Sequence, residues 1–141
     1  MTEPIKSFQG EHRWLSNFWT CRIVTSWGVF PSVEHAYVAA KTTDENIRRE
    51  IAALPTPGGV KRFGRTMFIR RDWSVIKLSV MEEAVRAKFM QHPELAAKLR
   101  ATGNAELIEG NTWGDRFWGV FKGQGENHLG KILMKVREEM R

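Results

Sequence analysis

The sequence has 141 residues, of which 42% are hydrophobic and 27% are charged, a composition typical of a soluble globular protein. No apolar stretch is long enough to span a bilayer, and the single cysteine excludes an internal disulfide or a multi-cysteine zinc site. The net charge of +6 favours a phosphate-bearing partner, either nucleic acid or a nucleotide. The alternative is that these basic residues, which are spread along the chain, form an ordinary solvated surface.

Length and the N-terminal residues give two further expectations. A chain of 141 residues is expected to form one domain over residues 1–141. Residues 1–4 contain no basic region followed by an apolar run, so we expect no signal peptide. A lone cysteine is typical of a reducing compartment. The sequence therefore predicts a cytoplasmic protein with no membrane partner.

The first half of the chain begins with an aromatic segment over residues 13–19. Residues 20–24 and 28–30 are predicted to form a short hairpin. A helix over residues 32–41 follows, with Ser32 as its N-cap. Asp44 precedes a second helix over residues 45–54, and Thr56 precedes a third, which begins at Pro57 and reaches residue 65.

The second half is predicted to contain three more helices. A long one starts at Trp73 and ends at His92, and its wide apolar stripe predicts the most buried helix of the protein. The next begins at Pro93 and ends near Ala101, and the last follows Asn127. Residues 105–109 are predicted to form a short strand. The expected fold is a mainly helical α+β domain with a small β-sheet.

The helix over residues 32–41 places two ionisable groups on one face. Glu34, Val38 and Lys41 repeat at i, i+4 and i+7, and seven residues advance a helix by about 10 Å. Lys41 leans back toward Glu34, because helical side chains point toward the N-terminus. A small ligand could sit between them, whereas His35 points away from Glu34 and forms no obvious dyad with it. The alternative is a solvated face carrying one acid and one base.

Three loops have compositions that folding alone does not readily explain. They are residues 15–18, residues 64–73 with their arginines, and the glycine-rich stretch over residues 114–130. Glycines allow close approach of a ligand to the backbone, and a glycine loop entering a helix can present N–H groups to an anion. The glycine spacing is that of neither a Walker loop nor a dinucleotide fingerprint. The alternative is that these are ordinary connections. The scattered histidines predict no zinc site.

The motifs taken together resemble the NADAR (YbiA-like) family. Their order and spacing match over nearly the whole chain. In place of the family's usual Glu-His-Tyr/Trp-Phe-Gln-Ala-Gln-Lys, this chain has Ala36, Val38 and Ala40 at three larger or polar positions. The motifs are Ser16-Asn17-Phe18, Pro31 to Tyr37 through Lys41, Gly64-Arg65, Arg71-Asp72-Trp73, Met81, Lys88-Phe89, Leu99 with Thr102-Gly103, Leu107 to Glu109, Asp115 with Trp118-Gly119, Gly125 to Gly130, Leu133-Met134 and Arg137.

This resemblance implies a compact, mostly helical fold and N-glycosidase chemistry. One branch of the family cleaves ribosyl-amine intermediates of riboflavin synthesis, and another removes ADP-ribose from guanine in DNA. Cleavage of a C1′–N bond builds positive charge on the sugar, which a carboxylate can stabilise. Alternatively, a lysine amine attacks C1′ and forms a Schiff base. The resemblance implies that Lys41 is the nucleophile, that Glu34 activates water or moves protons, and that Asp115 holds sugar hydroxyls or acts as the partner carboxylate.

The resemblance also implies the substrate-binding residues. Trp73 and Trp118 would stack on a base. Arg65 and Arg71 would face phosphate, and Asn17 and Asn127 would form hydrogen bonds with the substrate. The alternatives are that Trp73 packs at a helix start, that Arg71 pairs on the surface, and that Asn127 is only an N-cap. The expected residues are Ser16, Asn17, Phe18, His35, Gly64, Arg65, Arg71, Trp73, Trp118, Gly119 and Asn127. No metal or cofactor is expected.

Among substrates, ADP-ribosyl-guanine in DNA is preferred, because contact with DNA requires the phosphate charge to be neutralised. The alternatives are a phosphoribosylamino-pyrimidine as substrate, or a non-catalytic module that binds NAD or ADP-ribose. The sequence does not predict the oligomeric state.

Overall fold

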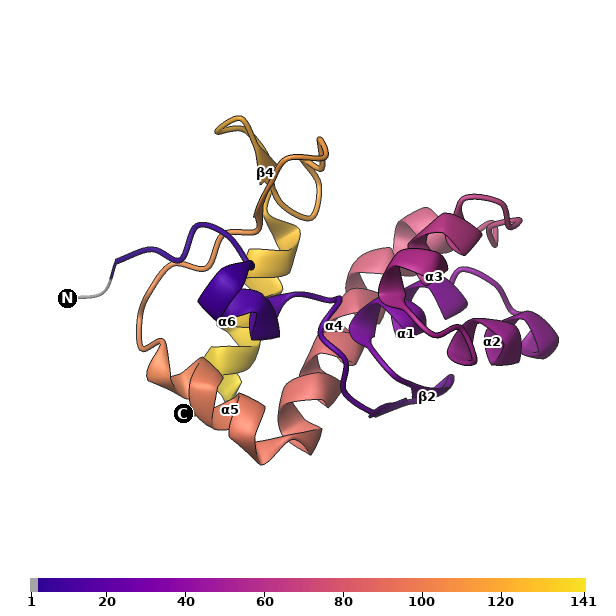
Figure 1. Cartoon of the computed structure of the whole chain (residues 1–141), viewed down its shortest axis with the longest axis horizontal. Helices are drawn as coiled ribbons and strands as arrows, with labels where there is room; N and C mark the ends of the chain where they lie inside the picture. The colour runs from indigo at the N-terminus through magenta and orange to yellow at the C-terminus, as the bar shows by residue number, and fades with distance from the viewer. Residues whose placement is uncertain (1–2) are drawn as a thin grey trace. The chain divides into compact units, whose positions relative to one another are not determined.

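The computed structural model describes residues 3–141 (Figure 1). Met1 and Thr2, part of the N-terminal stretch in which no signal peptide is expected, lie outside the described residues. The chain divides into two compact units, which we name by their place in the sequence. The central unit is Asn17–Lys88, and the terminal unit consists of the residues up to Ser16 together with Phe89–Arg141.

The central unit contains a hairpin and helices that begin where the sequence predicts. In the hairpin, Ile23 pairs with Phe30 and Thr25 with Gly28. Local capping sets the helix starts, because a side-chain oxygen bonds amides of the first turn at each of three helices. The elements are β1 (Ile23–Thr25), β2 (Gly28–Phe30), α1 (Val33–Ala39), α2 (Glu45–Ala52), α3 (Pro57–Gly64) and most of α4 (Trp73–Gln91); the capping residues are Ser32, Asp44 and Thr56.

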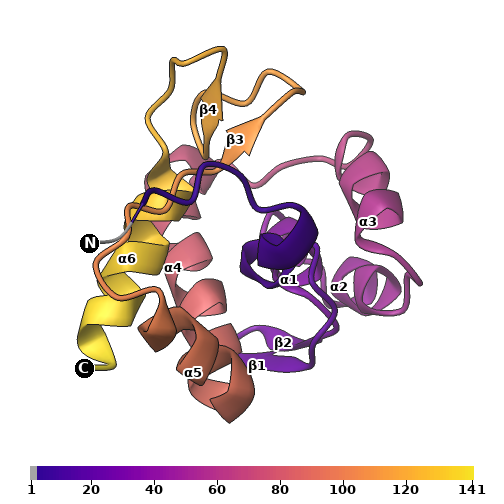
Figure 2. The same ribbon diagram turned by 60° about the vertical axis from the view of Figure 1, so that its left-hand side comes forward.

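The terminal unit contains the end of α4, two further helices, a 3-10 helix and a second small sheet. Its two strands pair in parallel, with Gly110 opposite Val120, and Figure 2 shows them side by side. Its elements are η1 (Gly10–Leu15), α5 (Pro93–Ala101), β3 (Gly110–Asn111), β4 (Val120–Phe121) and α6 (His128–Glu139). The predicted class, a mainly helical α+β fold, is confirmed. Within the described part of the chain, no helix is both long and apolar enough to cross a membrane.

The strand predicted over residues 105–109 is wrong. Leu107 makes only an isolated parallel bridge to Ile5. The Ile5 amide donates to the Glu106 carbonyl at 2.8 Å, and the Ile108 amide donates to the Ile5 carbonyl at 2.8 Å. The Gly110 amide then donates back to the Ile108 carbonyl at 2.9 Å, which bends the chain and ends this pairing. The strand forms after this bend, over Gly110–Asn111.

The prediction that the helix starting at Trp73 is the most buried is also wrong. In α4 the buried positions begin only at Met81, and near its start Val75 is 82% exposed and Leu78 41% exposed. Helix α1 is more completely buried, since Glu34 is its only residue that is not. A wide apolar stripe identifies a face that could be covered, but the covering elements have to come from elsewhere in the chain.

One buried position carries a lysine. Lys88 is 1% exposed, and burial lowers its pKa to about 7, against a smaller opposing effect of Cys21. A buried ammonium is costly unless its charge is compensated, so loss of the proton is favoured in the folded state.

This burial predicts a stability that depends on pH. The unfolded chain holds the Lys88 proton up to about its ordinary pKa of 10.5, whereas the folded chain releases it above about 7. Between these values the unfolded state binds one more proton, so the free energy of unfolding rises with pH by ~1.4 kcal/mol per unit. We expect Lys88→Met to flatten this slope in urea titrations between pH 7 and pH 9. Lys131→Met, at an exposed position, is the control and should keep the slope; an equal slope in both variants would contradict the prediction.

Candidate active site

Helix α1 carries Glu34, and Lys41 lies in the turn that follows, because the helix expected over residues 32–41 ends at Ala39. Hydrogen bonds hold the α1 backbone along its length. At its start, Ser32 Oγ accepts from the His35 amide at 3.0 Å. In its middle, Trp27 Nε1 donates to the Ala36 carbonyl at 2.8 Å. Glu34 and Lys41 are both half-buried, whereas Val38 between them is buried. The acid and the amine therefore stand on a well-supported backbone and are both partly accessible.

His35, predicted to bind substrate, has both ring nitrogens bonded inside the protein. Nδ1 lies 2.6 Å from Ser32 Oγ, and Nε2 lies 2.9 Å from the Leu54 carbonyl. Burial lowers the pKa of His35, against the opposing effect of the Leu54 bond. A neutral ring that accepts from Ser32 and donates to Leu54 fits these contacts. The arrangement gives His35 a structural role in holding α1.

The Lys41 amine lies beside two aromatic rings that contact each other. Nζ is 5.1 Å from the centroid of the Tyr37 ring and 5.9 Å from that of Trp73. The two rings meet edge to face, with centroids 5.1 Å apart. Tyr37 precedes Lys41 by four residues, the helical spacing at which side chains meet. Both contacts are within the distance at which a cation is attracted to a ring face.

Three influences act on the pKa of Lys41, and the net effect is to lower it. Burial lowers the pKa most, the negative charge of Glu34 raises it, and the positive charge of Lys77 lowers it. A lysine with a lowered pKa has more of its amine in the neutral form, which is the nucleophilic form. This electrostatic environment suits Lys41 to attack an electrophilic carbon.

The segment after α3 is attached to the end of α1 at Lys41 itself. The Arg70 amide donates to the Lys41 carbonyl at 2.8 Å. The Arg70 guanidinium donates to the Asp72 carboxylate through Nε at 2.6 Å and Nη2 at 3.1 Å. This two-point ion pair fixes the chain just before Trp73. Arg71, the predicted phosphate contact, is exposed.

Two other predicted residues of the central unit, Asn17 and Gly64, pack against or bond to α1. The Asn17 carbonyl accepts from the Glu34 amide at 3.1 Å, and Asn17 Nδ2 donates to Met81 Sδ at 3.5 Å. A Cβ on Gly64 would lie 3.0 Å from Val38 Cγ1, so glycine allows α3 to pack closely on α1. Two further predicted residues differ in exposure: Arg65 is exposed and Phe18 is half-buried.

In the terminal unit, Asp115 shapes a turn. Its Oδ1 accepts from the Phe117 amide at 3.0 Å and from the Trp118 amide at 2.8 Å, as in an Asx-turn. The Asp115 amide donates to Asn111 Oδ1 at 3.0 Å. The Trp118 ring meets the Phe117 ring edge to face at 4.8 Å. Ser16, also in this unit, is half-buried, and its amide donates to the Arg13 carbonyl at 2.9 Å.

Asn127 and Gly119 fit the same loop together. Asn127 stands at the N-cap position of α6 with a φ of 54°, but its side chain bonds a distant segment instead of the helix. Its Oδ1 accepts from the Glu109 amide at 2.9 Å, and its Nδ2 donates to the Leu107 carbonyl at 2.9 Å. A Cβ on Gly119 would overlap the carboxylate and carbonyl of Glu109. Both residues therefore shape the backbone here.

The terminal unit also has an open groove of about 1120 Å³. Its walls include Asn127, the lysines Lys6, Lys122 and Lys131, and the indole of Trp113. Within residues 3–141, no group of three or more His, Cys, Asp or Glu side chains is arranged to hold a metal ion.

The sequence prediction did not include three residues around Lys41. Tyr37 and Lys77 had usable signals, since Tyr37 lies one turn before Lys41 and Lys77 lies one turn after Trp73. Arg70 had none, because nothing in the sequence distinguishes it from its neighbour Arg71. The structure places five of the predicted residues in or beside α1: Asn17, Glu34, Gly64, Lys41 and Trp73. The terminal unit holds five others: Ser16, Asp115, Trp118, Gly119 and Asn127.

Comparison with known proteins gives a consistent family assignment. The NADAR domain matches residues 5–141. The chain is 41% identical over 128 residues to the N-glycosidase YbiA of Escherichia coli strain K12, covering 89% of this chain and 79% of that protein. It is 43% identical over 116 residues to an N-glycosidase of Nostoc punctiforme, covering 78% and 74% of the two chains. These names agree with the predicted class, a hydrolase acting on N-glycosyl compounds.

Two further matches extend over almost all of this chain. A riboflavin biosynthesis protein of Vibrio vulnificus is 39% identical over 145 residues, which is 99% of this chain but only 39% of that longer protein. The NMR structure of E. coli YbiA superimposes with a TM-score of 0.86 at 37% identity, covering 99% of this chain and 86% of that one. The sequence and the fold thus agree, and the chain belongs to the NADAR family.

Proposed function

We propose that this chain is a cytoplasmic N-glycosidase that removes ADP-ribose from guanine in DNA. The observation that carries the proposal is the half-buried Lys41 side chain, whose amine lies beside the rings of Tyr37 and Trp73 and has a lowered pKa. The net charge of +6 favours a polyanionic substrate over a small neutral one. The class of enzyme is the one for which the relatives from E. coli and N. punctiforme are named.

In the proposed reaction, the lone pair of Lys41 Nζ forms a bond to C1′ of the ribose. The bond from C1′ to the guanine nitrogen breaks, and that nitrogen keeps the electron pair and takes up a proton. The C1′–O4′ bond then opens, O4′ is protonated, and Nζ and C1′ form a protonated imine. Water adds to C1′ and the amine leaves, which restores Lys41 and releases ADP-ribose.

Glu34 supplies the proton transfers in this scheme. It is half-buried in α1, seven positions before Lys41, and its negative charge acts on the Lys41 amine. A carboxylate that reaches the amine can take a proton from the Lys41 ammonium before the attack, which leaves the neutral amine as the nucleophile, and can later take a proton from the attacking water. It can also stabilise the positive charge that develops at C1′, so the same residue serves if the bond breaks without a covalent intermediate.

The aromatic pair has a positioning role in this proposal. Tyr37 and Trp73 limit the directions that the Lys41 side chain can take, and they reduce its contact with water. Trp73 can in addition stack on the base, as predicted. The scheme uses residues of the central unit alone; Asp115, Trp118 and the other predicted residues of the terminal unit stay predictions.

The first test removes the nucleophile. We expect Lys41→Ala to lower release of ADP-ribose from ADP-ribosylated DNA by roughly 1000-fold or more, since a nucleophile and its partners act as a unit. Borohydride added during turnover should trap a protein–sugar adduct at Lys41, detected by peptide mass. Lys98→Ala, at an exposed position, is the control and should keep both signals.

The outcomes separate the possible mechanisms. Turnover that depends on Lys41 without a trapped adduct would favour cleavage through a charged sugar intermediate. Tight binding of ADP-ribose by folded protein with no cleavage of any substrate would favour a non-catalytic binding module and would reject the proposal.

The second test measures the proton equilibrium of Lys41 directly. An NMR titration of its Nζ should give a pKa below the ordinary value of 10.5, because burial is the largest influence. Glu34→Gln should lower the pKa further, since it removes the negative charge that favours the ammonium form. Lys77→Met should raise the pKa, since it removes a competing positive charge. Shifts in the same direction in both variants would contradict this account.

A second substrate class has its own support. The relative from V. vulnificus is named for riboflavin biosynthesis and matches 99% of this chain. A phosphoribosylamino-pyrimidine also carries a ribosyl C1′–N bond, and the same lysine could attack it. Parallel assays of both substrates with mass detection decide between them. Cleavage of the pyrimidine alone would overturn the preference for DNA and leave the N-glycosidase chemistry intact.

A further inference from the structure

The loop between α3 and α4 presents an aromatic ring to solvent. Phe68 is 98% exposed, more than any other large hydrophobic side chain in the described part of the chain, and its neighbour Ile69 is 49% exposed. Exposing a whole phenylalanine side chain forgoes roughly 2 kcal/mol of burial, and this position makes no evident contribution to the fold. A ring placed in this way is available for contact with a partner.

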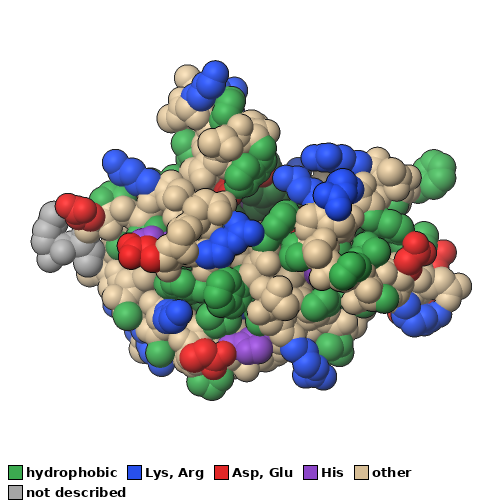
Figure 3. Space-filling view, in the orientation of Figure 1, with side chains coloured by type: hydrophobic (Ala, Val, Ile, Leu, Met, Phe, Trp, Pro, Cys, Tyr) green, Lys and Arg blue, Asp and Glu red, His purple; other side chains and the backbone are tan. Residues whose placement is uncertain are grey.

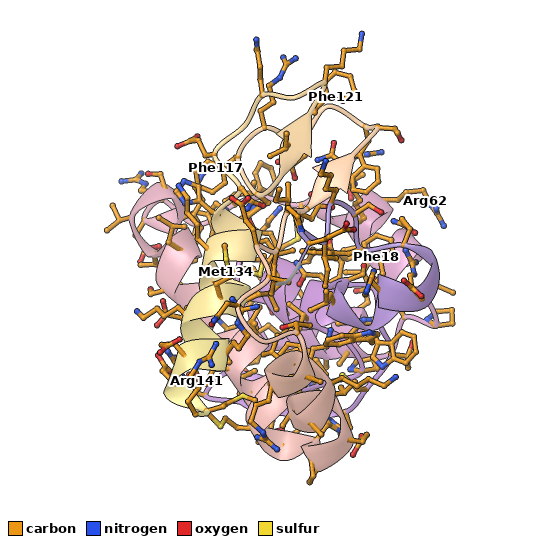
Figure 4. All side chains as sticks on the ribbon, turned by 90° about the vertical axis from the view of Figure 1, so that its left-hand side faces the viewer. Phe18, Arg62, Phe117, Phe121, Met134 and Arg141 are labelled. Atoms are coloured by element: carbon orange, nitrogen blue, oxygen red, sulfur yellow. The ribbon has the colours of Figure 1, made fainter. Side chains whose placement is uncertain are left out.

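The chain that leads up to and past Phe68 carries positive charge. Residues 51–71 contain five basic residues and no acidic one. Arg62, Arg65 and Arg71 are all exposed, and Figure 4 shows Arg62 projecting outward from α3. Figure 3 shows Lys and Arg side chains gathered at this end of the central unit. A planar, permanently charged guanidinium matches the geometry of a phosphate group.

The loop is also attached to the residue proposed to react. The Arg70 amide donates to the Lys41 carbonyl at 2.8 Å. Only Ile69 separates Phe68 from Arg70, so their Cα atoms are at most ~7 Å apart along the extended chain. A strand that contacts Phe68 therefore passes close to the end of α1 that carries Lys41.

We propose that residues 62–71, which we call the Phe68 loop, bind the DNA strand beside the modified guanine. Phe68 stacks on a neighbouring base, and Arg62, Arg65 and Arg71 contact the phosphates. Aromatic stacking combined with a positive surface is the general solution for binding a single strand without reading its sequence. The inference rests on the proposed function and extends it by naming the element that distinguishes a DNA substrate from a small one.

The charge and the apolar area of the Phe68 loop favour DNA over a lipid surface. Binding in the plane of a membrane requires a broad apolar face. The Phe68 loop offers one fully exposed ring and one half-exposed isoleucine, in a segment that also carries three exposed arginines. The apolar area is that of a single stacking contact.

The experiment compares a DNA oligonucleotide carrying one ADP-ribosylated guanine with ADP-ribosyl-guanosine. Phe68→Ser should lower kcat/KM on the oligonucleotide by roughly 5- to 150-fold, the range of one lost stacking contact. It should leave the nucleoside reaction within about twofold, and Phe68→Trp should restore the oligonucleotide reaction. Arg65→Gln combined with Arg71→Gln should reduce the dependence of binding on log salt by about 1.4 for single-stranded DNA.

Val75→Ser is the matched control, because it removes another apolar side chain that is 82% exposed in the central unit. It should react like the unaltered protein on both substrates. Equal rates for Phe68→Ser and the unaltered protein on the oligonucleotide would overturn the inference. So would sedimentation with anionic lipid vesicles that depends on Phe68 while the oligonucleotide reaction does not.

A binding measurement separates failure of the inference from failure of the proposed function. If the unaltered protein cleaves neither substrate, the proposed function fails. Fluorescence anisotropy with the unmodified oligonucleotide then decides the inference alone: weaker binding by Phe68→Ser, but not by Val75→Ser, supports it, and equal binding by all three proteins rejects it.

Discussion

The hydrogen bond from the Arg70 amide to the Lys41 carbonyl is the interaction on which the candidate site depends. Helix α1 has only seven residues, too few to be stable in isolation, and the carbonyls at its end need partners. Arg48 Nε donates to the Ala39 carbonyl at 3.3 Å and, in the turn after α1, to the Thr42 carbonyl at 3.0 Å, while the Arg70 amide donates to the Lys41 carbonyl of the same turn at 2.8 Å. The bond from the Arg70 amide also brings Trp73 beside the Lys41 amine. The same hydrogen bond therefore both holds the turn after α1 and positions Trp73 beside the lysine.

Opposing influences act on the protonation of the Lys41 amine. Burial favours the neutral form, whereas Glu34 and the two aromatic rings favour the ammonium form. A nucleophile that must attack, then leave as an amine, benefits from access to both forms. Glu34 lies in α1 and Lys41 in the turn that follows the helix, seven positions later in the chain. The charge of Glu34 acts on the amine from within the same short segment.

The sequence predicts what local interactions determine and fails where partners are distant. The starts of α1, α2 and α3 follow from Ser32, Asp44 and Thr56, because a cap bonds amides two or three residues away. The strand expected at 105–109 was misplaced because pairing depends on Ile5, about a hundred positions earlier. Helical spacing places Glu34 and Lys41 on one face. No periodicity could reveal that Arg70, and not Arg71, bonds the end of α1, since that contact joins segments about 30 residues apart.

Residues of a family motif serve two purposes that a sequence match cannot separate. His35 uses both ring nitrogens to hold α1, and Gly64 makes room for Val38. Gly119 and Asn127 likewise shape the backbone beside Glu109. The fold requires all four of these residues, whether or not they also contact a substrate. Glu34, Lys41 and Trp73 differ, because their side chains are half-buried and charged or aromatic, and packing alone does not require those chemical types. Catalytic residues are therefore more readily found among motif residues whose side chains are partly exposed than among motif residues whose side chains are buried.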